Sequence, residues 1–371
     1  MEGTGTGTGA GTGTSGSGRT TGSGADPGAE ATTGAGPSPR AHPHPHPHTH
    51  THPPRRRRHR VLTALAVALL LVPAVVVDCR LLGTDAVTPV PQLLSFLPWL
   101  AVPSVLGLVL AGFARRWVLA GLAVVVLAAT GWAARPYGPD RTTASGPVVA
   151  RLKVLSSNVE FGQATDGLID TVRRTEPDLV FVSECEYACT DALAARLGGQ
   201  YPYRAQVEAV GSSGSALISR RPLTGEAVVP GTLGMPGATL RLPGGTVRVQ
   251  LAHPMPPLPS QVGLWQRETR AVRDAVRAVR GPVLVAGDFN ASQDHAAFRD
   301  LLDTAGLHDS ARLAGASRTP SWPNEGVLPA YVQIDHVLVS DHFSVRSARF
   351  LDLAHTDHRA LLVELDLHER A

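Results

Sequence analysis

Residues 283–290 have the sequence VLVAGDFN, in which four apolar residues lead into a glycine, an aspartate and, two positions later, an asparagine. A short apolar run bounded by glycine or proline is typical of a buried strand. Because a carboxylate and an amide two residues apart on a tight turn can face one cleft, Asp288 is a candidate to orient or deprotonate water, and Asn290 to donate to a phosphoryl oxygen. A turn stabilised by the Asp288 side chain alone is the plain structural alternative.

Short apolar runs of the same kind recur through the last 220 or so residues and alternate with amphipathic stretches. This pattern is typical of a layered α/β domain. Strands are predicted at 152–157, 178–183, 215–219, 246–252, 282–287, 332–339 and 360–365, and helices at 164–175, 188–197, 261–279 and 294–304. Because several strands between 203 and 252 follow one another without a helix, a mixed two-sheet sandwich is favoured over a purely parallel sheet.

Acidic side chains follow the first two predicted strands. Asn158 and Glu160 come after the first strand, and Glu184 after the second. Strand ends present side chains to clefts, so the two acids suggest a site for a hard cation. Oxygen ligands favour Mg²⁺ or Mn²⁺ over zinc. Each acid taken alone can also be a solvated strand-end carboxylate.

Histidines and further acids follow the later strands. His253 comes after the strand at 246–252, Asp335 lies in the strand at 332–339, and Asp357 with His358 precedes the last strand. His358 beside a carboxylate is a possible acid/base pair. A structural or solvated histidine is the alternative at each position.

Taken in order, the motifs NVE, SE, H, GDFN, IDH and DH resemble those of the endonuclease/exonuclease/phosphatase superfamily, the metal-dependent fold of DNase I and the sphingomyelinases. The resemblance covers residues 152–367, with further matches in GSALISR at 214–220 and TPSWP at 319–323. It implies a four-layer, two-sheet α/β sandwich and in-line attack on phosphorus by a metal-assisted water.

The resemblance also implies roles for nine residues and Mg²⁺ or Mn²⁺ as cofactor. Catalytic roles go to His358, Asp288, Asp335, Asn290, His253 and Asn158, and metal binding to Glu184, Glu160 and Asp357. Within this set Glu184 is the main metal ligand, Asn158 and His253 contact the phosphate, and Asp335 orients the catalytic histidine. Whether Asp288 or His358 takes the proton from water stays open.

Three uncharged apolar runs precede this domain, at 61–77, 86–114 and 117–134. Since about 20 apolar residues cross a bilayer, we expect three transmembrane helices within 61–135; buried helices of a soluble protein are the alternative. Arginines cluster before the first run and between the second and third. The positive-inside rule then puts the N-terminus in the cytoplasm and predicts a multi-pass protein of the cell membrane with an extracytoplasmic catalytic domain. The arrangement looks like membrane-anchored bacterial members of the superfamily.

The remaining segments are a tail, a linker and a cysteine pair. Residues 1–60 are rich in Gly, Thr and Ser, then in alternating His and Pro, and end in an arginine cluster; we expect disorder and, at most, loose metal binding. Residues 136–150 read as a linker and 151–371 as the catalytic domain. Cys185 and Cys189 either form a disulfide beside Glu184 or remain two thiols.

These patterns predict a membrane-anchored phosphoesterase that prefers diesters to monoesters. Its substrate can be a lipid headgroup, a nucleic acid or an envelope phosphate, the bilayer is contacted through 61–135, and no protein partner is evident. Residues 150–371 carry 22 Lys and Arg against 25 Asp and Glu, so their charge gives nucleic-acid binding no support. An extracellular-facing nuclease of the same fold and a non-catalytic membrane module that binds a phosphate ligand are the alternatives.

Overall fold

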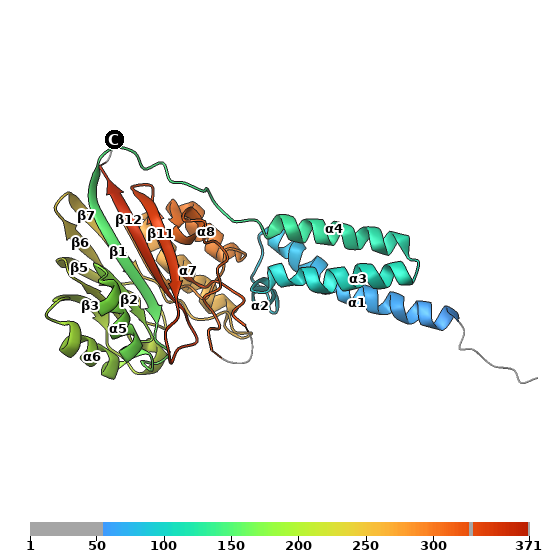
Figure 1. Ribbon diagram of the computed structural model, residues 1–371, viewed down its shortest axis with the longest axis horizontal. Helices are drawn as coiled ribbons and strands as arrows, with labels where there is room; N and C mark the ends of the chain where they lie inside the picture. Colours follow the sequence, from blue (N-terminus) through green and yellow to red (C-terminus); the bar gives the residue numbers. More distant parts are fainter. Residues whose placement is uncertain (1–54, 326–328, 370–371) are drawn as a thin grey trace, which may run out of the picture. The chain divides into compact units, whose positions relative to one another are not determined.

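The computed structural model describes residues 55–325 and 329–369. The tail was predicted to be disordered over residues 1–60. Its residues before 55, including the histidines expected to bind metal loosely, lie outside this part of the chain, whereas residues 55–60 are helical and the prediction is wrong there. Within it, helices come first and a two-sheet domain follows (Figure 1).

Three helices were expected within 61–135, and the second of them differs from the prediction. Its elements are α1 (Arg55–Leu82), α2 (Val90–Leu94), the 3₁₀ helix η1 (Leu97–Leu100), α3 (Ala101–Phe113) and α4 (Trp117–Ala133). The apolar run at 86–114 is therefore divided into three pieces. Pro89, Pro91 and Pro98 give the reason, because proline lacks an N–H donor and disfavours the helical conformation of the residue before it.

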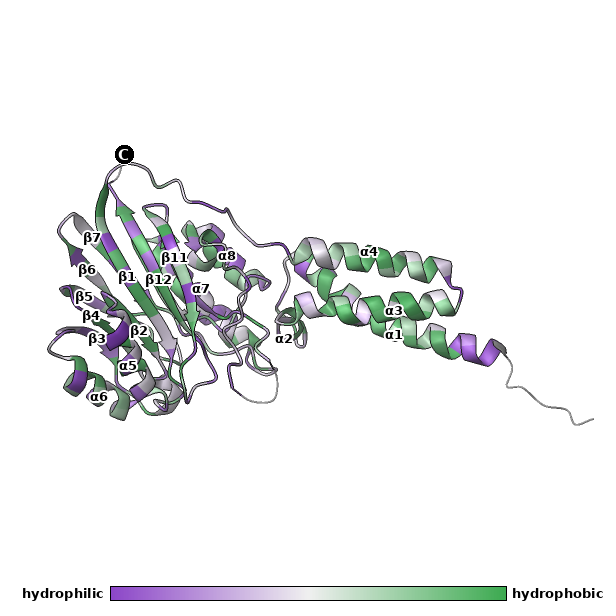
Figure 2. Cartoon of the chain, in the orientation of Figure 1, coloured by the Kyte–Doolittle hydropathy of each residue, from purple (hydrophilic) through white to green (hydrophobic). Residues whose placement is uncertain are grey.

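One described helix, Arg56–Leu82, is long and apolar enough to cross a membrane by length and composition, which is weak evidence on its own. The helices Leu97–Phe113 and Trp117–Ala133 are apolar but shorter. Figure 2 shows that α1 begins hydrophilic and then becomes as hydrophobic as α3 and α4. The three membrane crossings stay a prediction.

The second part consists of two six-stranded mixed sheets, which confirms the predicted two-sheet α/β architecture. One sheet has the order β11-β12-β1-β2-β4-β3 and the other the order β5-β6-β7-β8-β10-β9. In the first sheet β1 and β2 are parallel, and in the second β7 and β8 are parallel, whereas the other pairs are antiparallel. The strands of the first sheet are β1 (Val148–Asn158), β2 (Leu179–Ser183), β3 (Tyr203–Val207), β4 (Ser215–Ser219), β11 (Phe343–Leu351) and β12 (Ala360–His368). Those of the second are β5 (Leu223–Val228), β6 (Pro236–Leu242), β7 (Gly245–Leu251), β8 (Val283–Asp288), β9 (Leu307–Asp309) and β10 (Asp335–Ser340).

Helices cover the outer faces of the two sheets. They are α5 (Thr165–Thr175), α6 (Tyr187–Leu197), α7 (Val262–Arg277) and α8 (Ala296–Ala305), with the short η2 (Gly211–Ser213) and α9 (Ser310–Leu313) in connections. Side chains of α5 and α6 share one buried cluster with the first sheet, and those of α7 and α8 share another with the second. The layers therefore run helix, sheet, sheet, helix.

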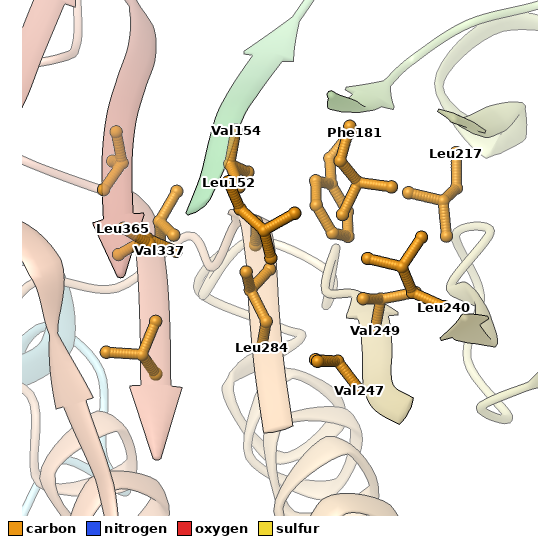
Figure 3. Close-up of a cluster of buried hydrophobic side chains, with 14 of the residues drawn as sticks. Leu152, Val154, Phe181, Leu217, Leu240, Val247, Val249, Leu284, Val337 and Leu365 are labelled. Carbon is orange, nitrogen blue, oxygen red and sulfur yellow. The ribbon is translucent and has the colours of Figure 1, made fainter. Parts of the chain in front are cut away.

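The central core lies between the two sheets. Leu152, Val154 and Phe181 from the first sheet meet Val249 and Leu284 from the second, and all are at most 2% exposed (Figure 3). Burying each large apolar side chain contributes about 1.5–3 kcal/mol, so this interface fixes the strands against each other. Its rigidity holds the neighbouring strand ends in place.

Candidate active site

The ends of β1, β2 and β8 bring an amide and two carboxylates together. Asn158 Nδ2 donates to Glu184 Oε1 (3.1 Å) and to Asp288 Oδ2 (3.2 Å). Asn158 ends β1, Glu184 follows β2 in the same sheet, and Asp288 ends β8 in the other sheet. One amide thus joins acids from both sheets, 130 positions apart in the case of Asp288.

Glu184 is held by an unusual local backbone. Its φ is +59°, a left-handed conformation that costs a non-glycine residue of order 1 kcal/mol. The backbone N–H of Phe161 donates to Glu184 Oε2 (3.1 Å). The next residue, Cys185, forms a disulfide with Cys189 at the start of α6, which decides the question that the sequence left open.

A histidine–carboxylate pair lies beside the three convergent groups. His358 Nδ1 donates to Asp335 Oδ2 (2.9 Å), and His358 Nε2 lies 3.7 Å from Asp288 Oδ2. Asp335 and Asp288 are direct register partners in β10 and β8. The structure therefore puts the predicted His358–Asp335 pair against the predicted Asp288, with all three side chains buried.

Two hydroxyl groups set the position of this pair. Ser321 Oγ accepts from the backbone N–H groups of Ile334 (3.0 Å) and Asp335 (3.1 Å). Thr356 Oγ1 donates to the carbonyl of Asn158 (3.0 Å) and accepts from the N–H of His358 (3.1 Å). Ser321 is part of the TPSWP match, but its positioning role cannot be recognised from residue type alone.

His253 and Asn290 line the cleft into which Glu184, Asp288 and His358 also project. His253 Nε2 is 3.8 Å from Glu184 Oε1 and 3.9 Å from Asp288 Oδ2. The N–H of Asn290 donates to Asp288 Oδ1 (2.8 Å), and its side-chain amide donates to the carbonyl of Pro254 (3.0 Å). The turn anticipated at Asp288 is thus present, and it occurs inside the cluster instead of replacing it.

Gly287 is required by the close approach of two strands. Its φ is +150°, and a Cβ there would lie 2.0 Å from the carbonyl oxygen of Ala252. Only glycine fits that combination of backbone angle and space. In the GDFN motif, Gly287 is thus required by backbone geometry, whereas Asp288 and Asn290 provide polar groups.

Glu160 and Asp357, two of the three predicted metal ligands, are bonded to other partners. Glu160 Oε2 accepts from the N–H of Asp357 (2.8 Å), and Asp357 Oδ2 accepts from the indole N–H of Trp322 (2.7 Å). Both line the cleft, and Asp357 Oδ1 is 3.6 Å from His358 Nε2. They form the rim, while Glu184 and Asp288 meet at Asn158.

Burial and neighbouring charges shift the acid–base properties of these groups. Burial raises the pKa of Glu184, and the charge of Asp288 adds to that rise. Burial also raises the pKa of Asp288, where Asp335 acts in the same direction. Burial lowers the pKa of His253 to about 4. Burial alone would lower the pKa of His358, but the charges of Asp335 and Asp288 have the larger effect and raise this pKa to about 10.

The donor set fits a hard divalent cation. Asp288, Asp335 and His358 each offer a ligand atom, and these atoms all lie within 4.8 Å of one another. Asp335 Oδ1 is buried and has no hydrogen-bond partner among the described residues. A cation among converging buried carboxylates would offset their mutual repulsion. These three residues were predicted to be catalytic, and the predicted ligand Glu184 lies beside them, joined to Asp288 through Asn158.

Comparison with known proteins gives the family. The model of the Endonuclease/Exonuclease/phosphatase family matches residues 155–358, more than half of the chain. The chain belongs to this family. Its matched span contains Asn158, Glu184, Asp288, Asp335 and His358. No curated protein matches the chain.

Two solved structures share the fold. D. rerio TDP2 complexed with single strand DNA product is 16% identical, with a TM-score of 0.51, over 58% of this chain and 99% of that one. An endonuclease/exonuclease/phosphatase from Bacteroides vulgatus is 14% identical, with a TM-score of 0.50, over 59% of this chain and 100% of that one. At such identities the likeness shows the fold alone. The helical part lies outside the family match.

Aromatic residues complete the cleft and were not anticipated. The cleft has a volume of about 510 Å³. It is lined by Phe96, Phe161, Trp322 and Tyr331 and by the polar cluster of Glu184, Asp288 and His358. Phe96 belongs to the apolar run that the sequence assigned to the membrane. Nothing in the local sequence distinguishes Phe96 from the neighbouring apolar residues, which are typical of a membrane-spanning helix.

Proposed function

We propose that the protein is a membrane-anchored phosphoesterase that depends on a divalent metal ion and hydrolyses phosphodiester bonds outside the cytoplasm. One observation carries the proposal: Asn158 holds Glu184 and Asp288 together beside the His358–Asp335 pair. A carboxylate pair for a cation and a histidine oriented by a third acid are the parts that phosphoester hydrolysis requires.

Glu184 and Asp288 would hold Mg²⁺ or Mn²⁺, with Glu160 and Asp357 at the rim of the site. The bound cation would neutralise charge on the phosphoryl oxygens and lower the pKa of a bound water. Asp335 accepts the Nδ1 proton of His358 and so fixes Nε2 toward Asp288. His253 would then donate to a phosphoryl oxygen as negative charge accumulates there, while Asn158, whose two amide hydrogens bond Glu184 and Asp288, keeps these carboxylates in place.

The hydrolytic step consumes one water molecule for each ester bond broken. The water oxygen bonds to phosphorus while the opposite P–O ester bond breaks, in line with the attack. Asp288 or His358 accepts the proton of the water, and the leaving oxygen takes up a proton. The products are an alcohol and a phosphomonoester.

Membrane anchoring is supported by the apolar helices and their flanking charges. The helix Arg56–Leu82 has the required length, and α3 and α4 are apolar along their whole lengths. Arginines at the start of α1 and between α3 and α4 favour the cytoplasm for those ends. Three crossings would then bring residues 151–371 to the outer face.

The test is hydrolysis by the purified full chain of a panel containing a generic diester, a generic monoester, DNA, RNA and phospholipids. Each is assayed with Mg²⁺, with Mn²⁺ and with EDTA, beside Asp288→Ala and His358→Ala. We expect diester turnover that requires metal and is lost in both variants. A folded wild-type chain that hydrolyses none of these substrates would contradict the proposal. Orientation is tested separately by labelling introduced cysteines in intact cells.

A further inference from the structure

The segment from Asp85 to Leu100 packs against the catalytic domain as part of one structure. Asp85 is buried, and its carboxylate accepts from the side chain of Gln266 (2.8 Å) and the N–H of Ala297 (2.9 Å). His295 Nε2 is 2.8 Å from the carbonyl of Pro91. These bonds link Asp85 and α2 to α7 and to the start of α8.

Ion pairs reinforce the same junction. Asp294 is buried and pairs with Arg318 at 2.7 Å and with Arg80 of α1 at 3.4 Å. Arg318 also donates to the carbonyl of Ala134 at the end of α4 (2.7 Å). Because a buried carboxylate is costly without its partners, these contacts fix the helices on the domain.

The fixed segment forms one wall of the catalytic cleft. Gln92, Ser95 and Phe96 line the same cavity as Asp288 and His358. The side-chain amide of Gln92 donates to the carbonyl of Pro257, which lies in a proline-rich part of the cleft lining. The cleft is therefore closed on this side by residues from the apolar N-terminal part of the chain.

An aromatic row leads from this wall to the polar cluster. The rings of Phe96 and Tyr331 stack with centroids 4.3 Å apart and planes 18° apart. Tyr331 meets Trp322 edge to face at 5.5 Å, and the indole of Trp322 donates to Asp357, the neighbour of His358. A substituent beside the phosphorus would therefore lie against aromatic faces.

The charges and size of the cleft indicate what that substituent is. No lysine or arginine occurs among the described residues that line it, although a polyanion such as nucleic acid requires several. About half of its lining residues are apolar or aromatic, with Leu233, Met255 and Leu258 among them. A volume of about 510 Å³ lies within the range of small-molecule sites, roughly 300–1,000 Å³, and far exceeds a phosphate group.

We propose that Phe96 and Gln92 are specificity-determining residues, and that the substrate is an amphiphilic phosphodiester whose apolar substituent lies on the row formed by Phe96, Tyr331 and Trp322. This inference rests on the proposed phosphodiesterase function and adds the substrate class to it. The segment that joins the membrane helices to each other thereby becomes part of the substrate site.

The test compares two diesters that differ only in one alkyl group, methyl p-nitrophenyl phosphate and octyl p-nitrophenyl phosphate. Hydrolysis of both releases p-nitrophenolate, and the full chain is assayed in detergent with Mg²⁺, with octyl ester below its micelle concentration. We expect kcat/KM for the octyl ester to exceed that for the methyl ester by about tenfold or more, because the octyl chain is removed from water. Phe96→Ala should lower this ratio by about tenfold, and Gln92→Ala by less.

Phe113→Ala is the matched control, since Phe113 ends α3 in the same helical part of the chain, is 70% exposed and does not line the cleft. Phe96→Leu keeps apolar bulk without the stacked ring and should lower the ratio partly, which provides a second variant if Phe96→Ala does not fold. A wild-type ratio near one, or a ratio that Phe96→Ala leaves unchanged, overturns the substrate class while the phosphodiesterase proposal stands. Turnover of neither ester overturns the phosphodiesterase proposal itself.

Discussion

The strand ends of the catalytic domain and the helical segment 85–100 build one cleft, but their sequences indicate this to different degrees. At the strand ends, motif and position agree: an apolar run ends in a polar residue, and that residue lies in the cleft. In the segment, apolar residues suggest lipid, yet several contact protein. Apolar composition reports that a side chain avoids water, and it does not report whether lipid or protein surrounds it.

The largest expected effect concerns the His358–Asp335 pair at the strand ends. We expect His358→Ala to lower kcat for diester hydrolysis by about 10²–10⁴-fold, the usual contribution of a positioned acid or base. Asp335→Asn should lower it less, and the double variant should be no worse than His358→Ala, because Asp335 acts through the histidine. If the fold-losses in kcat of the two single variants multiply in the double variant, the two residues act independently.

The second effect concerns the junction that fixes the helical segment. Asp294→Ala leaves Arg318 and Arg80 without their carboxylate, and breaking a buried pair typically costs about 3–5 kcal/mol. We expect a clearly lower Tm of the full chain and faster proteolysis within 136–147. Asp300→Ala is the control, since the Asp300 side chain is 49% exposed and its pair with Arg273 should contribute at most about 1 kcal/mol. Equal effects of the two variants would contradict the account of the junction.

The third effect separates backbone geometry from side-chain chemistry in the GDFN motif. Gly287→Ala should destabilise the fold by more than about 2 kcal/mol, because its φ of +150° and the carbonyl of Ala252 leave no room for a Cβ. Gly306→Ala, at φ +62° with open space around it, should cost about 1 kcal/mol. Thermal unfolding of both variants checks this order, and a reversed order would refute it.

The smallest effect concerns the disulfide beside Glu184. Replacing Cys185 and Cys189 together by serine opens a five-residue loop and should cost about 2 kcal/mol on the chain-entropy model. We also expect a weaker requirement for the bridge in catalysis than in stability, because Phe161 and Asn158 still hold the Glu184 carboxylate. A loss of activity as large as that of His358→Ala would show that the bridge itself positions the metal ligand.

The fold was predictable wherever local patterns carry the information. The strand ending at Asp288 and the helices α5 and α7 follow from periodicity and from glycine and proline punctuation. Strand β11 was not predicted, because its residues are mostly half-buried and lack clear alternation. Strand β9 has only three residues, too few for a periodic signal.

Within the site, residue types and motif positions indicated which side chains lie near the strand ends. The hydrogen-bond partners of these side chains depend on tertiary contacts. Asn158, Glu184 and Asp288 lie together as their positions suggested. The bond from Trp322 to Asp357 and that from Asp357 to Glu160 are tertiary contacts that no local pattern encodes. The same holds for Phe96, whose partner Tyr331 is more than 200 positions away in the chain.

The central claim is that Glu184 and Asp288, joined by Asn158, form the metal site of a phosphodiesterase. The most direct measurement is the rate of diester hydrolysis by the full chain as a function of Mg²⁺ concentration, for wild type, Glu184→Gln and Glu226→Gln, an exposed glutamate on β5. We predict that EDTA abolishes the wild-type rate, that Glu184→Gln raises the Mg²⁺ concentration for half-maximal rate by at least about tenfold, and that Glu226→Gln matches wild type. Hydrolysis that persists in EDTA, or equal Mg²⁺ curves for wild type and Glu184→Gln, would contradict the claim.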